Sequence, residues 1–476
     1  MYAQLHLVID GERLSASTHP GEPVINPATG GVLTELPHAT AADLDRALDA
    51  AARAFVGWRR TTPLERSRIL RRGADLIRER LDAIALIMTL EQGKPLAESR
   101  AEISHGVDVL DWYAEEGKRA YGRIIPSRNA GVRQLVDHEP LGVAVAFTPW
   151  NFPALTPCRK IGGALAAGCT LILKAAEETP GTAVEIVRAL HDAGLPPGVL
   201  NLVFGDPAKV SSHLIASPIS RKVSFTGSVP VGRLLLKQAA EGLKRSTLEL
   251  GGHSPVLVFD DADADAAAVA LAGGKFRNAG QVCISPTRFY VHEKVFDQFT
   301  DRFVAAAKAL KVGNGADADV TMGPLVNARR VEAMERFVAD AQARGGEVRT
   351  GGQRLGNAGF FFEPTVITDV PDDALLMTEE PFGPVAPVVR FSDFDEVIAR
   401  ANSLPFGLAA YAFARSNATV MAVGEALKAG MVGVNTLAIS TPETPFGGVR
   451  DSGHGQEGGI EGLQAYLDVK LIAQAS

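Results

Sequence analysis

The stretch "GVAVAFTPWNFP", residues 142–153, joins a continuous apolar run to a short loop that contains two prolines. An apolar run without alternation is typical of a strand buried on both faces, as in a parallel sheet covered by helices. Pro149 and Pro153 mark the point where such a strand must stop. The stretch therefore predicts a buried strand over 142–149, followed by a rigid loop.

Apolar runs of this kind recur through the middle third of the chain. Further apolar runs lie at 170–175, 200–205, 222–227 and 246–251. Helical apolar spacing separates them, at 153–167, 182–194, 207–216 and 230–242. Strands and helices in alternation predict an α/β fold with a doubly wound parallel sheet, whose ligands gather at the carboxyl ends of the strands.

The flanking regions extend this organisation. Residues 42–56 and 64–91 have helical spacing, and a second alternating section from 254–261 to about residue 450 predicts another α/β domain. The last stretch, 464–475, predicts a strand beyond the final glycine cluster. A terminal strand far from its own core often pairs with another subunit.

Composition excludes several classes of protein. The 476 residues are 46% hydrophobic and 22% charged, as in an ordinary globular protein of two or three domains. A net charge of −7 without any Lys/Arg block argues against nucleic-acid binding. The start of the chain lacks a secretory signal, no apolar stretch could span a membrane, and three cysteines fit a reducing compartment. A cytoplasmic location is expected.

Polar residues follow two of the strands. Asn151 could donate its amide to a developing oxyanion, or it could simply form an Asx turn or a helix cap. Lys174 and Glu177 are three residues apart and could bind ribose hydroxyls, with a surface ion pair as the plainer alternative.

Glycine marks the ends of the next two strands. Gly227 and Ser228 precede a predicted helix whose free N–H groups would suit a phosphate, although the pattern is not G-x-G-x-x-G. Glu249 ends an apolar strand, where burial would raise its pKa toward that of a general base. A solvated carboxylate at the strand edge is the alternative.

Cys283, in "RNAGQVCIS" (277–285), is the candidate nucleophile. Its small and polar neighbours indicate close backbone approach and partial exposure, whereas Cys158 and Cys169 lie in apolar contexts and are expected to be structural. A thiolate attacks carbonyls well but needs a base or a positive field to form. No histidine or cysteine spacing indicates a metal site, and the G-x-S-x-G elbow of hydrolases is absent.

Seven motifs together resemble the aldehyde dehydrogenase superfamily, in the order that the family has them. They are "FTPWNFP" (147–153), "LKAAEETP" (173–180), "FTGSVPVG" (225–232), "LELGG" (248–252), "GQVC" (280–283), "EEPFGPV" (379–385) and "PFGGVRDSG" (445–453). The resemblance implies that Cys283 attacks an aldehyde, that Asn151 and the Cys283 N–H hold the oxyanion, and that Glu249 activates the water that hydrolyses a thioester.

The resemblance also implies a cofactor site. Its residues are Thr148, Pro149, Trp150, Lys174, Glu177, Gly227, Ser228, Leu250, Glu380 and Phe382. Glu177 would repel a 2′-phosphate and so favours NAD, with NADP as the alternative because Lys174 acts in the opposite sense. Ala175 stands where the family usually has proline after the lysine, which loosens that turn.

The substrate implied is a short ω-carboxy aldehyde, with succinate semialdehyde expected first, because the sequence is most similar to succinate-semialdehyde and 2-oxoglutarate-semialdehyde dehydrogenases. Arg159, Arg277 and Ser440 match residues that hold the distal carboxylate in that group, and Phe446 would line the cleft. Alternatively, Arg159 pairs with an acid and Arg277 packs structurally. The alternative substrates are 2-oxoglutarate semialdehyde, glutarate semialdehyde or a broader range of aldehydes. Ser285 stands where some members have a second cysteine, so no local disulfide switch is expected.

By resemblance, the fold has three parts: a Rossmann-like cofactor domain (1–122 and 141–251), an α/β catalytic domain (252–451) and a small β bridging element (123–140 and 452–476). The bridging element usually builds homodimers or homotetramers. Two rival functions remain: transfer of the acyl group to coenzyme A, against which Glu249 argues, and a catalytically silent protein on the same scaffold.

Overall fold

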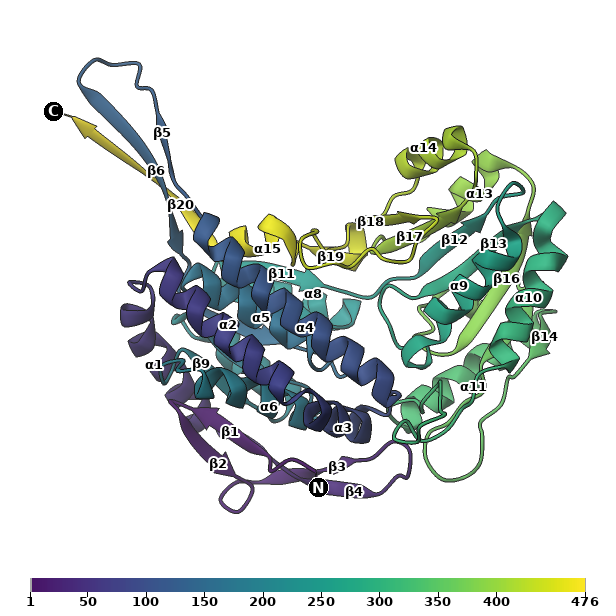
Figure 1. Cartoon of the computed structure of the whole chain (residues 1–476), viewed down its shortest axis with the longest axis horizontal. Coiled ribbons are helices and arrows are strands. Elements are labelled where there is room, and N and C mark those ends of the chain that lie inside the picture. Colours follow the sequence, from purple (N-terminus) through teal and green to yellow (C-terminus); the bar gives the residue numbers. More distant parts are fainter. Residues whose placement is uncertain (1, 476) are drawn as a thin grey trace.

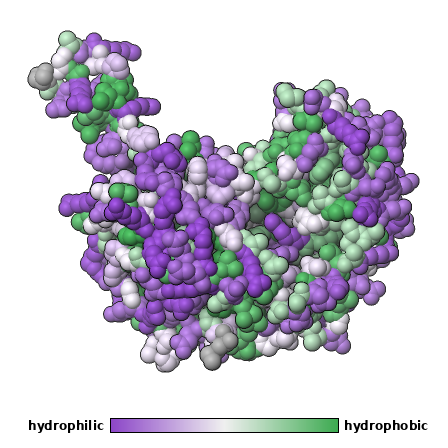
Figure 2. Space-filling view, viewed as in Figure 1, coloured by the Kyte–Doolittle hydropathy of each residue, from purple (hydrophilic) through white to green (hydrophobic). Residues whose placement is uncertain are grey.

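The computed structural model describes residues 2–475, which form two α/β lobes facing each other and an arm that projects from one lobe (Figure 1). Polar side chains cover the outside, whereas apolar ones gather in the hollow between the lobes (Figure 2). No helix within residues 2–475 is long and apolar enough to cross a membrane. The hollow is therefore the feature that the fold presents to a ligand.

The first lobe is built on an eight-stranded sheet. In spatial order its strands are β19 (Gly453–His454), β11 (Arg245–Glu249), β10 (Ser220–Thr226), β7 (Val143–Phe147), β8 (Thr170–Lys174), β9 (Leu200–Val203), β1 (His6–Ile9) and β2 (Glu12–Ser15). The five strands from β11 to β9 are parallel and largely buried, as the apolar runs predict. Strand β19 at one edge, and β1 and β2 toward the other, pair antiparallel with their neighbours.

Helices cover this sheet on both faces. They are α1 (Ala41–Trp58), α2 (Pro63–Glu79), α3 (Leu81–Gln92), α4 (Leu96–Glu116), α5 (Leu155–Ala167), α6 (Pro180–Asp192), α7 (Pro207–Ala216), α8 (Val229–Glu241) and α15 (Gly459–Gln464). The helical pattern over 64–91 is two helices, because the chain leaves helical geometry at Arg80 (φ −103°, ψ 9°). A small hairpin, β3 (Gly21–Ile25) and β4 (Val32–Pro37), precedes them.

The second lobe has a seven-stranded sheet with its own apolar core. In spatial order its strands are β14 (Glu347–Thr350), β15 (Thr365–Thr368), β16 (Val385–Phe391), β13 (Pro286–His292), β12 (Ser254–Val258), β17 (Ala409–Phe413) and β18 (Met431–Val434). Its helices are α9 (Ala264–Phe276), α10 (Phe296–Lys308), α11 (Ala328–Ala343), α12 (Leu375–Thr378), α13 (Phe394–Ala401) and α14 (Asn417–Ala426). Short 3₁₀ turns are η1 (Gly117–Arg119), η3 (Glu293–Val295) and η4 (Arg450–Ser452), and η2 (Arg277–Gly280) is a short turn whose last three residues are left-handed.

The arm is a three-stranded antiparallel sheet of β5 (Arg123–Ile125), β6 (Val132–Pro140) and β20 (Leu467–Ala475). Strand β20 pairs with β6 along its whole length, from Leu467 opposite Pro140 to Ala475 opposite Val132. The predicted terminal strand is thus present and lies beside residues more than 300 positions earlier. Figure 1 shows the arm standing clear of both lobes.

Candidate active site

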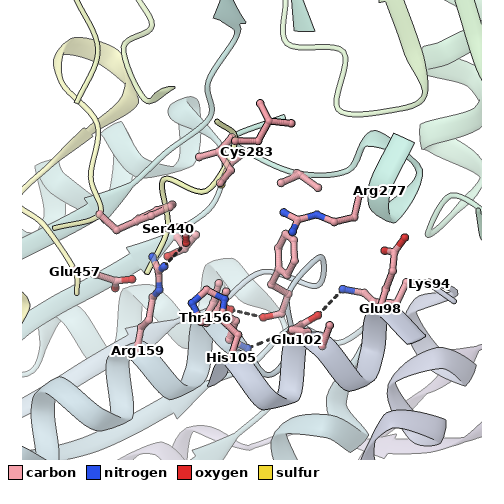
Figure 3. A pocket seen from close by; sticks show the side chains of 18 of the residues that line it. Lys94, Glu98, Glu102, His105, Thr156, Arg159, Arg277, Cys283, Ser440 and Glu457 are labelled. Carbon is pink, nitrogen blue, oxygen red and sulfur yellow. Dashed lines mark hydrogen bonds and ion pairs between the residues drawn. The ribbon is translucent and has the colours of Figure 1, made fainter. Parts of the chain in front are cut away.

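Cys283 lies where two cavities meet in the hollow between the lobes. One cavity, of about 500 Å³, has walls from the carboxyl ends of the first lobe's strands and from the second lobe. The other, of about 320 Å³, is walled by α4, α5 and loops of the second lobe (Figure 3). Both include Cys283, Phe152, Thr156 and Thr226. A group bound in either cavity would therefore reach the same sulfur.

The turn before Cys283 has an unusual backbone. Asn278, Ala279 and Gly280 are all left-handed, with φ of 51°, 52° and 73°. Hydrogen bonds fix this turn: the Asn278 N–H donates to the Glu98 carboxylate at 2.9 Å, and the Val326 N–H donates to Gln281 Oε1 at 3.0 Å. Three left-handed residues in succession reverse the chain tightly, which presents Cys283 at the cavity wall.

Cys283 is half-buried, as its polar neighbours predict, whereas Cys158 and Cys169 are buried in the core. Burial raises the pKa of the Cys283 thiol to about 12, and the nearby Glu380 carboxylate acts in the same direction. Burial also raises the pKa of Cys169 to about 11 and that of Cys158 further. The free Cys283 is therefore a thiol at neutral pH and must lose its proton when it reacts.

Asn151 lies against the left-handed turn at 278–280. Its side-chain Nδ2 donates to the backbone carbonyl of Gln281 at 3.0 Å. The backbone carbonyl of Asn151 accepts from Lys94 Nζ at 2.7 Å and from Asn278 Nδ2 at 3.0 Å. An amide nitrogen carries two hydrogens, so one bond to Gln281 leaves the second for another acceptor. The side chain lines the larger cavity, beside Cys283.

Glu249 ends β11 and lines the same cavity. It is buried, and neither of its carboxylate oxygens has a hydrogen-bond partner among residues 2–475. Burial raises the pKa of this carboxyl well above its usual value, and the buried Glu457 carboxylate raises it further. The structure thus confirms the buried carboxyl expected from sequence, in place of a solvated one.

The larger cavity collects most of the predicted cofactor residues. Pro149, Trp150, Gly227, Ser228, Leu250, Glu380 and Phe382 all line it. Ser228 is the N-cap of α8 and makes no side-chain hydrogen bond to that helix, so its hydroxyl is not used in capping and the first N–H groups of the helix lack a side-chain partner there. Trp150 and Phe382 meet edge to face, with ring centroids 5.6 Å apart.

Glu380 enters this cavity from the second lobe. It accepts a hydrogen bond from the Gly252 N–H at 3.1 Å, and burial raises its pKa to about 7. A Cβ at position 251 would lie 2.4 Å from Glu380 Oε2, so this approach requires glycine at 251. The close contact thus joins the "LELGG" and "EEPFGPV" segments at the cavity wall.

Three predicted cofactor residues lie beside the cavity and not in its wall. Lys174 and Glu177 form an ion pair of 2.6 Å in which both side chains are mostly covered. The Thr148 N–H donates to the Lys174 carbonyl at 3.1 Å, which joins the ends of β7 and β8. The structure therefore places these residues at the predicted sheet edge but does not bring them into the cavity around Cys283.

The smaller cavity holds the predicted substrate residues. Arg159 is buried, donates to Ser440 Oγ at 2.8 Å, and lies over the Phe446 ring at 4.0 Å. Arg277 is exposed and lies 5.6 Å from the centre of the Phe152 ring. Within residues 2–475 neither guanidinium forms an ion pair, so the alternative in which Arg159 neutralises an acid is wrong.

A model of the aldehyde dehydrogenase family matches residues 15–472. The chain belongs to the aldehyde dehydrogenase family. It is 48% identical to a Comamonas testosteroni protein named 4-(hydroxymethyl)benzenesulfonate dehydrogenase, over 99% of this chain and 98% of that one. It is 46% identical to the Escherichia coli strain K12 protein named succinate-semialdehyde dehydrogenase [NADP(+)], over 98% and 96%. The solved succinate-semialdehyde dehydrogenase from Burkholderia pseudomallei has a TM-score of 0.98 at 46% identity, covering 100% of this chain and 98% of that one.

This aldehyde dehydrogenase is thus an oxidoreductase that acts on small aldehydes, and its fold is the expected one. The larger cavity suits a dinucleotide: the start of α8 offers N–H groups to phosphate, and the Glu380 carboxylate can accept from ribose hydroxyls. Its aromatic and apolar walls at Trp150, Leu250 and Phe382 suit a planar ring.

Several residues that line the cavities of this aldehyde dehydrogenase were not predicted from sequence. Asn327, Arg329 and Arg330 border the larger one, and Lys94, Glu98, Glu102, His105 and Glu457 border the smaller one. The spacing of Glu98, Glu102 and His105 places them on one helix face, and this spacing is the only feature of the sequence that groups them. A polar helix face normally indicates solvent, so only the packing of α4 across the hollow identifies it as a cavity wall.

Proposed function

We propose that the chain oxidises short aldehydes that carry an anionic group at the distal end, succinate semialdehyde first among them, to the corresponding acids. The observation that carries this proposal is the position of Cys283 between two unlike cavities. One suits a dinucleotide, and the other contains two guanidinium groups without carboxylate partners among the described residues. The nucleophile would meet the aldehyde carbon from one side and the cofactor from the other.

In the proposed reaction, Cys283 Sγ attacks the aldehyde carbon, and the thiol proton passes to a base. The second N–H of Asn151 Nδ2 and the Cys283 backbone N–H stabilise the oxyanion that forms. A bound nicotinamide cofactor supplies the hydride acceptor. Glu249, a buried carboxyl with a raised pKa and free oxygens, then takes a proton from the water that releases the acid from Cys283.

The proposed cofactor is NAD(P), with NAD preferred. Ser228 and the α8 N-terminus would bind phosphate, and Glu380 would bind the ribose beside the nicotinamide. Lys174 and Glu177 would face the ribose next to the adenine, where the Glu177 charge disfavours a 2′-phosphate. The Escherichia coli relative is named for NADP, so the preference is a property to be measured for this chain.

Arg159, Arg277 and Ser440 are the proposed recognition groups for the distal anion, with Phe446 and Phe152 as apolar walls. A guanidinium group binds a carboxylate or a sulfonate through two N–H groups at once. The two relatives described above are named for a carboxylate-bearing and a sulfonate-bearing compound, which supports a distal anion in general. Glutarate semialdehyde and 2-oxoglutarate semialdehyde are the alternative substrates within this class.

The wider organisation is also part of the proposal. We assign 1–122 and 141–251 to cofactor binding, 252–451 to catalysis, and 123–140 with 452–476 to bridging. Exposed apolar residues on the arm, among them Ile124, Leu471 and Ile472, support homodimers or homotetramers built through it. Three unpaired thiols support a reducing, cytoplasmic setting.

The test is a panel of substrates with the purified protein, in which the absorbance of the reduced nicotinamide measures the rate of each reaction. Succinate semialdehyde, glutarate semialdehyde and butanal are each tried with NAD and with NADP. We expect kcat/KM for the anionic aldehydes to exceed that for butanal by at least about tenfold, because charge-assisted hydrogen bonds contribute about 1.5–3 kcal/mol. Equal rates with butanal would contradict the proposal.

Coenzyme A in parallel reactions separates hydrolysis from acyl transfer. With Glu249 in place, the free acid should form at the same rate whether or not coenzyme A is present. An acyl-thioester product would assign the chain to the transfer reaction instead. No turnover with any aldehyde, together with a Cys283 thiol whose labelling is unaffected by NAD, would indicate a silent scaffold.

A further inference from the structure

His105 differs from the other polar residues that α4 presents to the smaller cavity. Glu98 accepts from the Asn278 N–H at 2.9 Å, and Glu102 accepts from the Ala154 N–H at 2.8 Å and forms an ion pair with Lys94. These carboxylates are therefore occupied in holding the catalytic loops. His105 Nε2 is buried and has no hydrogen-bond partner in the described part of the chain.

Arg159 has a second such atom in the same cavity. Its Nη2 donates to Ser440, but its buried Nε has no partner within residues 2–475. Figure 3 shows His105 on α4 and Arg159 on α5 at one end of the cavity, with Cys283 at the other end. A buried polar nitrogen without a partner is costly, and two that line one cavity indicate that a ligand supplies the acceptors.

His105 adds a hydrogen-bonding group here without adding a charge. Burial lowers its pKa, and the charge of Arg159 lowers it further; Arg277 acts in the same direction, whereas Asp108 and Glu443 raise it. The ring is therefore neutral at neutral pH, and in one tautomer Nε2 carries a hydrogen. Two guanidinium groups already suffice for the two oxygens of a carboxylate, so a third donor suits a third oxygen.

We propose that His105 is a specificity-determining residue that donates from Nε2 to a third oxygen at the distal end of the substrate. The inference rests on the proposed oxidation of aldehydes with a distal anion, and it specifies one class among those aldehydes. That class has three acceptor oxygens at its distal end: a sulfonate, or a carboxylate with an oxo oxygen on the adjacent carbon.

Two matched pairs of aldehydes test the inference. 3-Sulfopropanal is paired with succinate semialdehyde, and 2-oxoglutarate semialdehyde with glutarate semialdehyde, so that each pair differs by the third oxygen. His105→Phe should lower kcat/KM for the three-oxygen member of at least one pair by about tenfold to a hundredfold, the loss expected for one hydrogen bond to a charged group. The two-oxygen member should change by less than about threefold.

The pair that shows the loss identifies whether the third oxygen belongs to a sulfonate or to an oxo acid. His105→Gln, which keeps an N–H on a side chain of similar reach, should retain more of the selectivity than His105→Phe. His213→Phe, at a partly exposed histidine outside both cavities that pairs with Asp45, is the matched control and should change neither pair of aldehydes. His105→Ala replaces the phenylalanine variant if circular dichroism shows that the latter is unfolded.

Equal losses within both pairs, or no change in either, would overturn the role of His105. That result is distinct from a failure of the proposed function, which would appear in the unaltered enzyme as equal kcat/KM for succinate semialdehyde and butanal.

Discussion

The two cavities that meet at Cys283 differ in which of their charged groups the protein itself anchors. In the larger one backbone anchors two charged groups: Glu380 accepts from the Gly252 N–H, and Arg330 donates to the Pro381 and Phe382 carbonyls, whereas the Glu249 carboxylate has no hydrogen-bond partner among residues 2–475. In the smaller one Arg277 has no ion-pair partner among the described residues, and Arg159 Nε and His105 Nε2 have no hydrogen-bond partner there. The comparison indicates a fixed site for a cofactor beside a site that depends on its ligand for completion.

Cys283→Ala removes the atom that the two cavities share and has the largest expected effect. Dehydrogenase turnover should fall by on the order of 10⁴-fold or more, because the covalent route is lost. Binding of NAD, measured by fluorescence titration, should persist. Cys169→Ala is the control and should keep its activity, since that thiol is in the core. Substantial turnover by the Cys283 variant would contradict the proposal that Cys283 is the reacting group shared by the two cavities.

Glu249→Gln tests the general base on the cofactor side. We expect kcat to fall by about 10²–10⁴-fold, since the amide cannot take a proton from water. Rapid-mixing absorbance should still show one equivalent of reduced cofactor per site, followed by a stall. Glu241→Gln, at an exposed position of α8, is the control. Loss of the first turnover as well would assign Glu249 to the attack step.

Arg277→Ala addresses the smaller cavity. The kcat/KM for succinate semialdehyde should fall by about ten- to a hundredfold, whereas that for butanal should stay within about threefold. Steady-state kinetics with both substrates measure the difference. Arg60→Ala, at an exposed arginine that lines neither cavity, controls for general charge effects. Equal losses on both substrates would remove the anion-binding role.

Glu177→Gln sharpens the account of cofactor choice. The ratio of kcat/KM for NADP to that for NAD should rise by about tenfold, because one like-charge repulsion of a 2′-phosphate is removed while Lys174 remains. Saturation curves for both cofactors give the ratio. Glu178→Gln is the neighbouring control. An unchanged ratio would show that the Lys174–Glu177 pair acts only within the protein.

Glu249→Gln should also change the free energy of unfolding, and this is the smallest of the expected effects. The folded-state pKa of Glu249 is raised, so the folded protein binds this proton more tightly than the unfolded chain does. That contribution is complete below the ordinary pKa near 4.5 and is lost as the pH rises through the folded-state value. The variant should therefore be more stable than the unaltered enzyme at pH 7 and equally stable near pH 4.5.

Thermal unfolding of the two proteins between pH 4.5 and 8, without cofactor, measures this difference. The gap in Tm should widen with pH. A gap that is constant over the range would mean that the Glu249 carboxyl is not desolvated in the free enzyme.

The sequence predicts the parts of the molecule whose signals are local. The apolar runs of β7 to β11 identify buried parallel strands, and Asn151, Glu249 and Cys283 are found because they end strands or sit in short motifs. The antiparallel strands β1 and β19 could not be predicted, since their pairing depends on segments distant in the sequence. The cavity face of α4 was missed for the same reason: Glu98 and His105 have ordinary helical spacing, and only tertiary packing turns them inward.

The left-handed turn at 278–280 limits how the active site can be redesigned. Side chains with branched Cβ atoms cannot adopt the φ of Asn278 and Ala279 without strain, and a Cβ at 280 would lie 2.2 Å from the Gly383 carbonyl oxygen. A library that randomises these three positions would return mostly inactive protein. Efforts to change the accepted aldehyde are better directed at Leu155, Leu437 and Phe446, which border the same space from conventional backbone.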